Sequence, residues 1–278
     1  MKDVLINTTS VESLYASLSE FFKVEEEVLK RFISNNIDEY INMDCRDVDL
    51  DKFFDIFNIK GNELVFNYIT INHVTTRLDK EINLDTFKID NLENVLLSEN
   101  SLTNFLKNKG IEFRMNEGIE VCYNGKVVNF TGIYSTRLNK RLKCLKDSCI
   151  NGFLFGDEIP STYESLTAVP EIVSDIIMEL DKKEFILEYA MHVRCFVASI
   201  TVSIDDLIID ELSFITSKIE KSKNILRYIL IYLAYKNVNS IYNSCKNPII
   251  RLPDNKNVTK DNIFNLREIQ HYKEVFKR

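Results

Sequence analysis

Apolar residues recur at three- and four-residue steps along residues 11–33, and this spacing predicts an amphipathic helix. The residues that share the apolar face are Val11, Leu14, Tyr15, Leu18, Phe21, Phe22, Val28, Leu29, Phe32 and Ile33. Thr9 and Glu12 fit a capping box, in which two side chains satisfy free N–H groups at the start of a helix. A second helix is predicted over residues 48–58, so the N-terminal segment is expected to be helical.

The pattern then changes to that of strands. Residues 64–71 are rich in β-branched and aromatic residues and apolar on both faces, which predicts a buried strand. Residues 195–204 follow a period of two, which predicts another strand. Asn124 and Gly125 stand between two strand-like runs, and this dipeptide suits the positive φ angles of a type I′ turn. A β-hairpin is therefore predicted over residues 119–130.

Shorter elements complete the predicted architecture. The other predicted strands are 150–155, 249–252 and 262–269, and the other predicted helices are 91–109, 136–147, 170–190 and 205–243. Strands do not alternate regularly with helices, as they would in a parallel α/β sheet. We therefore predict an α+β fold, with a helical N-terminal segment at residues 1–60 and a split, mainly antiparallel sheet domain at residues 61–278.

The amino-acid composition mainly indicates which classes of function are not expected. The net charge of −7 disfavours a general nucleic-acid-binding role, because phosphate contacts need clustered Lys and Arg. One basic stretch departs from this overall charge, and it is either a solvated helix face or a pocket wall that receives phosphate. It consists of Arg137, Lys140, Arg141, Lys143 and Lys146.

The chain is expected to be soluble and cytoplasmic, without a membrane partner. Its most apolar stretch, residues 225–235, is interrupted by Arg227 and is too short to span a bilayer. No secretory signal is recognisable, and the six cysteines include no C-x-x-C pair. We therefore expect reduced thiols and no structural zinc site.

Several enzyme signatures are missing from the chain. It contains neither the glycine-rich loops of P-loop and dinucleotide-binding folds nor the G-x-S-x-G and H-E-x-x-H motifs of hydrolases and zinc proteases. It has only three histidines, so a multi-histidine metal site is not expected. His73 stands out because it follows the predicted strand 64–71. There it is either a hydrogen-bonded residue at a strand end or a group that faces a ligand.

The residues around His73 resemble the start of the ADP-ribosyltransferase fold. The run Asn72–Thr76 reads N-H-V-T-T, and the helix predicted after it has an N-L…L character at Asn91, Leu92 and Leu96. In that family a strand delivers a histidine followed by a small hydroxyl residue, and the histidine binds the ribose of NAD. The resemblance implies that NAD is the cofactor, that His73 binds its ribose and that Thr75 supports His73.

Over residues 64–270, the order of the predicted strands and helices is also similar to that of the family. The family also uses an aromatic residue that stacks on nicotinamide and a glutamate that stabilises the positive ribosyl centre. Tyr163 is the implied stacking residue, because it lies between the strand at 150–155 and the helix at 171. Many members carry the glutamate just before their closing strands, where this chain has Asn247. Glu171 or Glu211 would then have to supply the carboxylate.

The resemblance implies an ADP-ribosyltransferase-like protein that uses NAD to modify a macromolecular target. A toxin or defence role in a bacterium or phage is typical of such proteins. Asn247 favours an alternative, a catalytically inactive binding or scaffold module of the same fold. A second alternative is a Mg²⁺-dependent nuclease, because hard cations prefer carboxylate oxygens. Its acidic residues would be Asp205, Asp206, Asp210 and Glu211, which also suit the capping of a helix.

Overall fold

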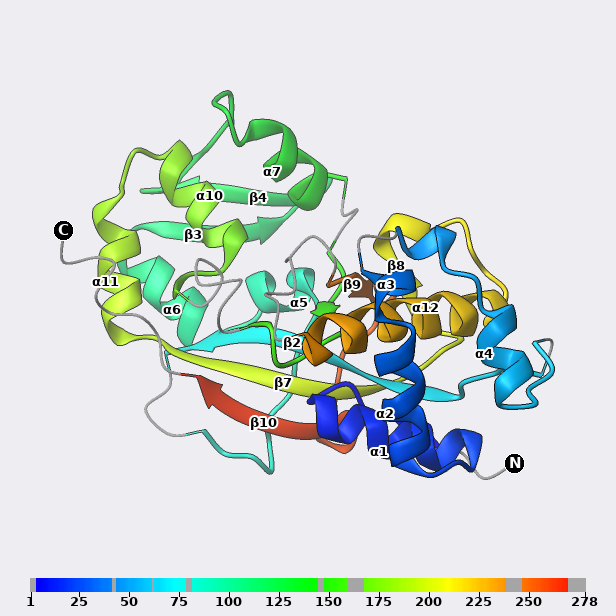
Figure 1. Cartoon of the computed structure of the whole chain (residues 1–278). Coiled ribbons are helices and arrows are strands. Elements are labelled where there is room, and N and C mark those ends of the chain that lie inside the picture. Colours follow the sequence, from blue (N-terminus) through cyan, green and yellow to red (C-terminus); the bar gives the residue numbers. More distant parts are fainter. Residues whose placement is uncertain are drawn as a thin grey trace. The chain divides into compact units, whose positions relative to one another are not determined.

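The structure is a computed structural model that describes residues 4–41, 44–61, 63–78, 82–144, 148–159, 168–238 and 247–269. Helices and strands are both present (Figure 1), and most strand pairings in these ranges are antiparallel. The predicted α+β class with a mainly antiparallel sheet is confirmed. Within the same ranges, no helix combines the length and apolar character needed to cross a bilayer.

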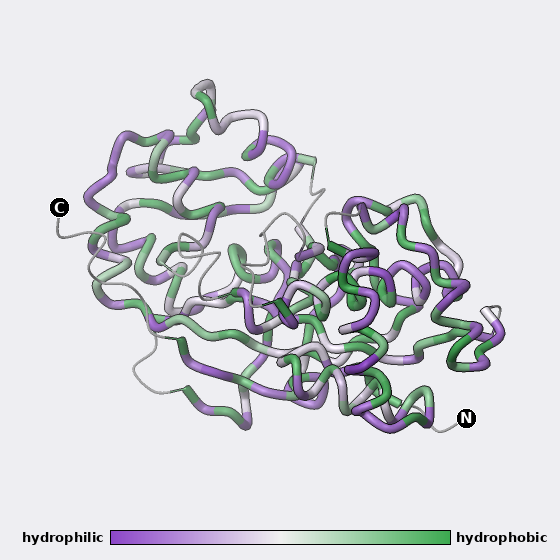
Figure 2. The backbone as a smooth tube through the Cα atoms, in the orientation of Figure 1, coloured by the Kyte–Doolittle hydropathy of each residue, from purple (hydrophilic) through white to green (hydrophobic). Residues whose placement is uncertain are grey.

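The larger sheet has the strand order β10-β7-β2-β6-β9-β8, and β1 pairs in parallel with β2. Its strands are β1 (Leu5–Ile6), β2 (Tyr68–Arg77), β6 (Asn151–Phe153), β7 (Arg194–Ser203), β8 (Ile208–Ile209), β9 (Ile249–Arg251) and β10 (Ile263–Ile269). Hydrophobic residues follow most of β7 (Figure 2), and every residue from Cys195 to Ile200 is buried. The predicted strands near 150, 195, 249 and 262 are therefore confirmed.

The chain divides into two compact units, and the boundaries between them fall inside the long strands β2 and β7. The first unit comprises the described residues of Met1–Asn72, Asn151–Thr162 and Ser199–Arg251, and the second unit comprises the rest. This division differs from the predicted boundary at residue 60. The reason is that the N-terminal helices pack against α12 (Lys218–Asn237), which lies far away in the sequence.

The N-terminal part of the first unit is helical, as predicted, but its helices are shorter. They are α1 (Val11–Phe22), α2 (Glu26–Asn35), α3 (Ile37–Tyr40), the 3₁₀ helix Cys45–Asp47 and α4 (Asp51–Ile56). The prediction of one helix over 11–33 is wrong, because Lys23 adopts a left-handed φ of 56° and ends α1. The predicted capping box is also wrong: the N-cap is Ser10, whose hydroxyl accepts the Ser13 N–H at 3.1 Å.

The second unit has its own three-stranded antiparallel sheet, which is formed by β3 (Ile111–Met115), β4 (Ile119–Tyr123) and β5 (Lys126–Val127). Asn124 and Gly125 turn between β4 and β5 with φ angles of 48° and 77°. The predicted hairpin is confirmed, since both residues have the positive φ that a type I′ turn requires.

The helices of the second unit cover this sheet and build an apolar core with it. They are α5 (Leu92–Leu97), α6 (Ser101–Asn108), α7 (Ser135–Leu142), α10 (Glu171–Glu179) and α11 (Glu184–His192). Two predicted helices are wrong because each is interrupted. The helix predicted over 91–109 stops at Ser98, and a new capping box begins at Asn100. The helix predicted over 170–190 is broken near Asp181, whose φ is 54°.

Gly125 allows a test of the hairpin turn. A Cβ added at this position would meet no atom within 4 Å, so only the backbone conformation opposes a side chain. We expect Gly125→Ala to lower the free energy of unfolding by about 1 kcal/mol, because φ is positive there. Chemical denaturation followed by circular dichroism would measure the change. A loss above about 3 kcal/mol would contradict this interpretation, since it exceeds the strain of one left-handed residue.

Candidate functional site

The second unit contains a cavity of about 600 Å³. Its walls come from residues 73–78 of β2 and the stretch after it, from the segment 82–90, and from α5 and the start of α6. Cys149, Ile150, Pro170, Ile172 and Tyr189 complete the lining. The volume lies in the range of small-molecule sites, and the lining combines apolar residues with a few converging polar groups.

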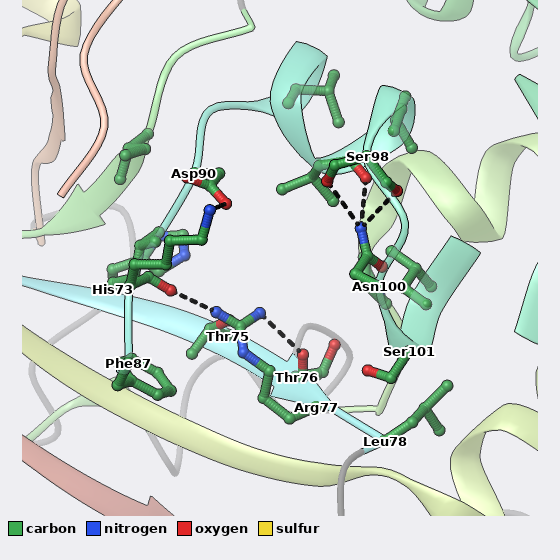
Figure 3. Close-up of a pocket in the computed structure, with 18 of the residues that line it drawn as sticks. His73, Thr75, Thr76, Arg77, Leu78, Phe87, Asp90, Ser98, Asn100 and Ser101 are labelled. Carbon is green, nitrogen blue, oxygen red and sulfur yellow. Dashed lines mark hydrogen bonds and ion pairs between the residues drawn. The ribbon is translucent and has the colours of Figure 1, made fainter. Parts of the chain in front are cut away.

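His73 lies within β2 and lines the cavity (Figure 3). The prediction that the strand ends at residue 71 is wrong, because β2 continues through the β-branched residues Val74, Thr75 and Thr76 to Arg77. His73 is therefore fixed on both sides by regular strand backbone instead of standing at a strand end. It is half-buried.

Two threonines follow His73 on the same strand. Thr75 is 7% exposed and lines the cavity, so the H-x-T triplet faces one space. The Thr76 hydroxyl lies 2.9 Å from the hydroxyl of Tyr189, which is buried on α11. This hydrogen bond ties β2 to α11 and stabilises the wall on which His73 lies.

Arg77 supplies a positive charge to the cavity. Its Nη2 donates to the backbone oxygen of Lys88 at 2.9 Å, and its Nη1 donates to the backbone oxygen of Thr76 at 3.4 Å. The guanidinium carbon lies 5.1 Å from the centroid of the buried Phe87 ring. Backbone oxygens and a ring face thus orient the guanidinium (Figure 3).

The wall opposite β2 is formed by two helix starts. Asn91 caps α5 by accepting the Asn94 N–H at 2.9 Å, and it donates to the backbone oxygen of Asp254. Asn100 caps α6 in a capping box with Thr103, and its amide donates to the backbone oxygens of Val95 and Ser98. Figure 3 shows Ser98 and Asn100 across the cavity from His73 and Asp90. These bonds hold the wall in one conformation.

Among the described residues, two carboxylates line the cavity, and neither was predicted from the sequence as a site residue. The side chain of Asp90 is 17% exposed, and one of its oxygens lies 2.8 Å from the ammonium of Lys88. Glu99 is exposed and stands between Ser98 and Asn100. One sequence feature could have pointed to Asp90 as a site residue: it directly precedes Asn91, the residue that begins the N-L…L run.

Glu171 does not line the cavity, although its neighbours Pro170 and Ile172 do. It forms ion pairs with Arg137 and Arg141 of α7. Arg137 also donates to Asp175 at 2.7 Å; burial raises the pKa of the Asp175 carboxyl, an effect that Arg137 partly offsets. Both arginines of the basic stretch therefore bind carboxylates of α10, and neither forms part of the cavity wall.

The other predicted site residues lie elsewhere. Asn247 belongs to the first unit, is 3% exposed and binds the backbone of Phe155 through both ends of its amide, at 3.0 and 2.9 Å. Glu211 also belongs to the first unit, where Tyr228 donates to it at 3.5 Å. Neither lines the cavity of the second unit. Tyr163 lies outside the described residues.

Two of the four acidic residues proposed for a magnesium site form ion pairs with cationic side chains. Asp205 pairs with Lys218 at 3.1 Å, and Asp210 pairs with Arg251 at 3.2 Å. In the parts of the chain that the structure describes, no three His, Cys, Asp or Glu side chains converge as metal ligands would. This arrangement gives the nuclease alternative no support.

Comparisons with known proteins do not narrow the function further. No protein-family model matches the chain, and no significant match was found among curated proteins or among solved structures.

Proposed function

We propose that the chain is an ADP-ribosyltransferase-like protein whose second unit binds NAD in the cavity beside His73 and transfers ADP-ribose to a macromolecular target. One observation carries the proposal: His73 and Thr75, the H-x-T pair of the family, lie on one strand and line a cavity of about 600 Å³. A toxin or defence role of the whole protein is part of the same proposal, by analogy with the family.

The cavity supplies groups suited to a nucleotide. His73 and Thr75 both line the cavity, and an imidazole and a hydroxyl are groups that can hydrogen-bond the hydroxyl groups of a ribose. Apolar side chains of α5, among them Leu92, Val95 and Leu96, offer a surface on which a flat ring can pack. The cavity therefore combines both kinds of contact that a nucleoside needs.

The reaction also needs a negative charge near the ribose. Loss of nicotinamide leaves positive charge on the sugar, and a fixed carboxylate lowers the energy of that state. Within the described residues, Asp90 and Glu99 are the carboxylates that line the cavity, whereas Glu171 and Glu211 do not. We assign this role to Asp90 because its side chain is largely buried in the wall, while Glu99 is exposed.

Binding of NAD can be measured without any activity, through two cysteines. Cys149 lines the cavity and is half-buried, whereas Cys144 is exposed and lies outside the lining. We expect about 1 mM NAD to slow the alkylation of Cys149 by iodoacetamide several-fold and to leave Cys144 unchanged, as mass spectrometry would show. Equal alkylation of Cys149 with and without NAD would contradict binding in this cavity.

His73→Ala tests the assigned role of the histidine. We expect the affinity for NAD to fall about ten-fold, because one hydrogen-bonding group of the site is lost, and the release of nicotinamide to fall at least as much. Isothermal titration and a nicotinamide-release assay would measure the two effects. His192→Ala is the matched control, because His192 is exposed at the end of α11 and does not line the cavity. If His73→Ala retained full NAD turnover, the assignment would be wrong.

A second candidate function is a module that binds NAD without turning it over. Asn247 occupies the position at which the family carries its glutamate, and its amide is used to bind the backbone of Phe155. The same experiments separate the two candidates. Protection of Cys149 by NAD without any release of nicotinamide would support the binding module, whereas release of nicotinamide that depends on His73 and Asp90 would support the transferase.

A further inference from the structure

Asp90, the carboxylate assigned above to the proposed reaction, lies between two residues that a remote segment holds in place. Ile89 and Val258 form an antiparallel bridge: the Ile89 N–H donates to the Val258 oxygen at 2.9 Å, and the Val258 N–H donates to the Ile89 oxygen at 2.8 Å. On the other side, the Asn91 N–H donates to Oδ1 of Asn257 at 2.8 Å. Hydrogen bonds to residues 257 and 258 therefore fix the backbone on both sides of Asp90.

The Asn257 side chain also reaches the first turn of α5. Its Oδ1 accepts a second hydrogen bond, from the side-chain nitrogen of Asn94 at 3.2 Å. Asn94 is tied in turn to Asn91, whose side chain accepts the Asn94 N–H at 2.9 Å and donates to the backbone oxygen of Asp254. A single oxygen atom thus joins the loop before β10 to the residue that follows Asp90 and to the helix that begins there.

Asn257 supports the wall of the cavity from outside. It is exposed and does not line the cavity, whereas Asp90 does. Asn91, through which it acts, is 7% exposed. Replacing Asn257 therefore removes no core packing, and the effect of a substitution comes from the hydrogen bonds that are lost.

The position of Asp90 matters because a carboxylate lowers the energy of a developing positive charge only if it is already held near that charge. The described segment 82–90 contains no helix or strand, so the place of Asp90 at the cavity depends on contacts with other parts of the chain. A misplacement of about 1 Å can reduce the rate of a reaction by about two orders of magnitude.

We infer that Asn257 is a positioning residue, which acts through Asn91 to hold Asp90 at the cavity. That the carboxylate held in this way serves the transfer of ADP-ribose rests on the proposed function. The hold on the backbone around Asp90 can be tested without NAD.

Hydrogen exchange followed by mass spectrometry tests this hold in the absence of any ligand. The leucine of Asn257→Leu accepts no hydrogen bond, so we expect the amides of residues 89–94 to exchange about ten-fold faster. Asn257→Asp keeps an oxygen that can accept both N–H groups, so we expect exchange within about two-fold of the wild type. Asn255→Leu is the matched control, because Asn255 is an exposed asparagine of the same loop and does not line the cavity.

The nicotinamide-release assay tests what the hold contributes to the reaction. We expect Asn257→Leu to lower kcat about ten-fold and to change KM for NAD less than about two-fold, because the groups assigned to NAD binding are untouched. Asn257→Asp should retain the kcat of the wild type. In an Asp90→Asn background, Asn257→Leu should lower kcat by less than about a further two-fold, because it acts through a carboxylate that is already gone. A loss of stability alone would show neither this division between kcat and KM nor the dependence on Asp90.

The outcomes separate this inference from the proposed function. Unchanged exchange of residues 89–94 in Asn257→Leu would overturn it. So would a wild type that turns NAD over and loses no kcat in Asn257→Leu, or loses as much in the Asp90→Asn background. If the wild type neither bound NAD nor turned it over, the proposed function alone would fail, and faster exchange that is absent from Asn257→Asp would still support the hold on Asp90.

Discussion

Replacing Asn72 by leucine is expected to lower the free energy of unfolding by about 3–5 kcal/mol, the largest stability effect that we predict for a single substitution. Asn72 is fully buried in the first unit. Its amide nitrogen donates to the backbone oxygen of Leu154 at 3.0 Å and to the hydroxyl of Thr8 at 3.3 Å. Its oxygen accepts from the hydroxyl of Ser199 at 2.8 Å. Leucine has nearly the same size and can make none of these bonds.

The cost arises because the partners of Asn72 remain buried after the substitution. A buried polar group that loses its hydrogen bond retains the full penalty for leaving water. Since Ser199 is 4% exposed, its hydroxyl has little access to water in the variant. The three strands that meet at this point, β2, β6 and β7, would therefore be destabilised together.

Chemical denaturation and a double-mutant cycle with Ser199→Ala would test this explanation. Ser199→Ala should cost less in the Asn72→Leu background than in the wild type, because the hydroxyl that it removes has already lost its partner. Asn104→Leu serves as a control on the exposed face of α6, and we expect a change within about 0.5 kcal/mol. Additive costs for Asn72 and Ser199 would show that their hydrogen bond is not the cause.

Gly118→Ala is expected to destabilise the second unit by about 2–3 kcal/mol, through overpacking. A Cβ at this position would lie 2.7 Å from the Cα of Lys143 and 2.8 Å from the backbone oxygen of Leu142. These are backbone atoms at the end of α7, so they cannot move aside as the tip of a flexible side chain could. Hydrogen exchange or a thermal melt would report the loss.

Gly125→Ala is the matched comparison for Gly118→Ala. Gly125 has a positive φ and empty space around it, whereas Gly118 has crowded surroundings and no positive φ. We therefore expect the larger loss at Gly118, although it is Gly125 that has the backbone angle usually reserved for glycine. A larger loss at Gly125 would mean that backbone strain outweighs packing in this unit.

The local elements were predictable where residues favour one backbone conformation by themselves. Asn124 and Gly125 adopt the positive φ angles that their dipeptide indicates, and β7 lies where the period-two pattern predicted it. The helix predictions erred where a regular apolar spacing continued across a break. The face from residue 11 to 33 is continuous in sequence, yet Lys23 leaves the helical conformation and divides it. The spacing of apolar residues indicates which residues are buried. It does not reveal a single residue at which the backbone leaves the helical conformation.

The candidate site was predictable only in part. The pattern around His73 indicated a residue of interest, and Thr75 was identified with it; both line the cavity. Arg77 shares their strand and would have followed from the alternation, had the strand been predicted to continue past residue 71. The alternation along a strand could not identify Asp90, because this residue lies between two short elements, where a carboxylate is common in a loop.

The sequence by itself determined the α+β class, the hairpin at Asn124 and Gly125, and the strand character of β7 and of the start of β2, because these depend on local conformational preference and on the spacing of apolar residues. Only the tertiary structure decided which polar residues share a cavity. It grouped Arg77 and Asp90 with His73 and placed Glu171 against α7. The physical reason is that a carboxylate or guanidinium is equally stable at many exposed positions, so its neighbours are set by the packing of the core beneath it and not by its own place in the chain.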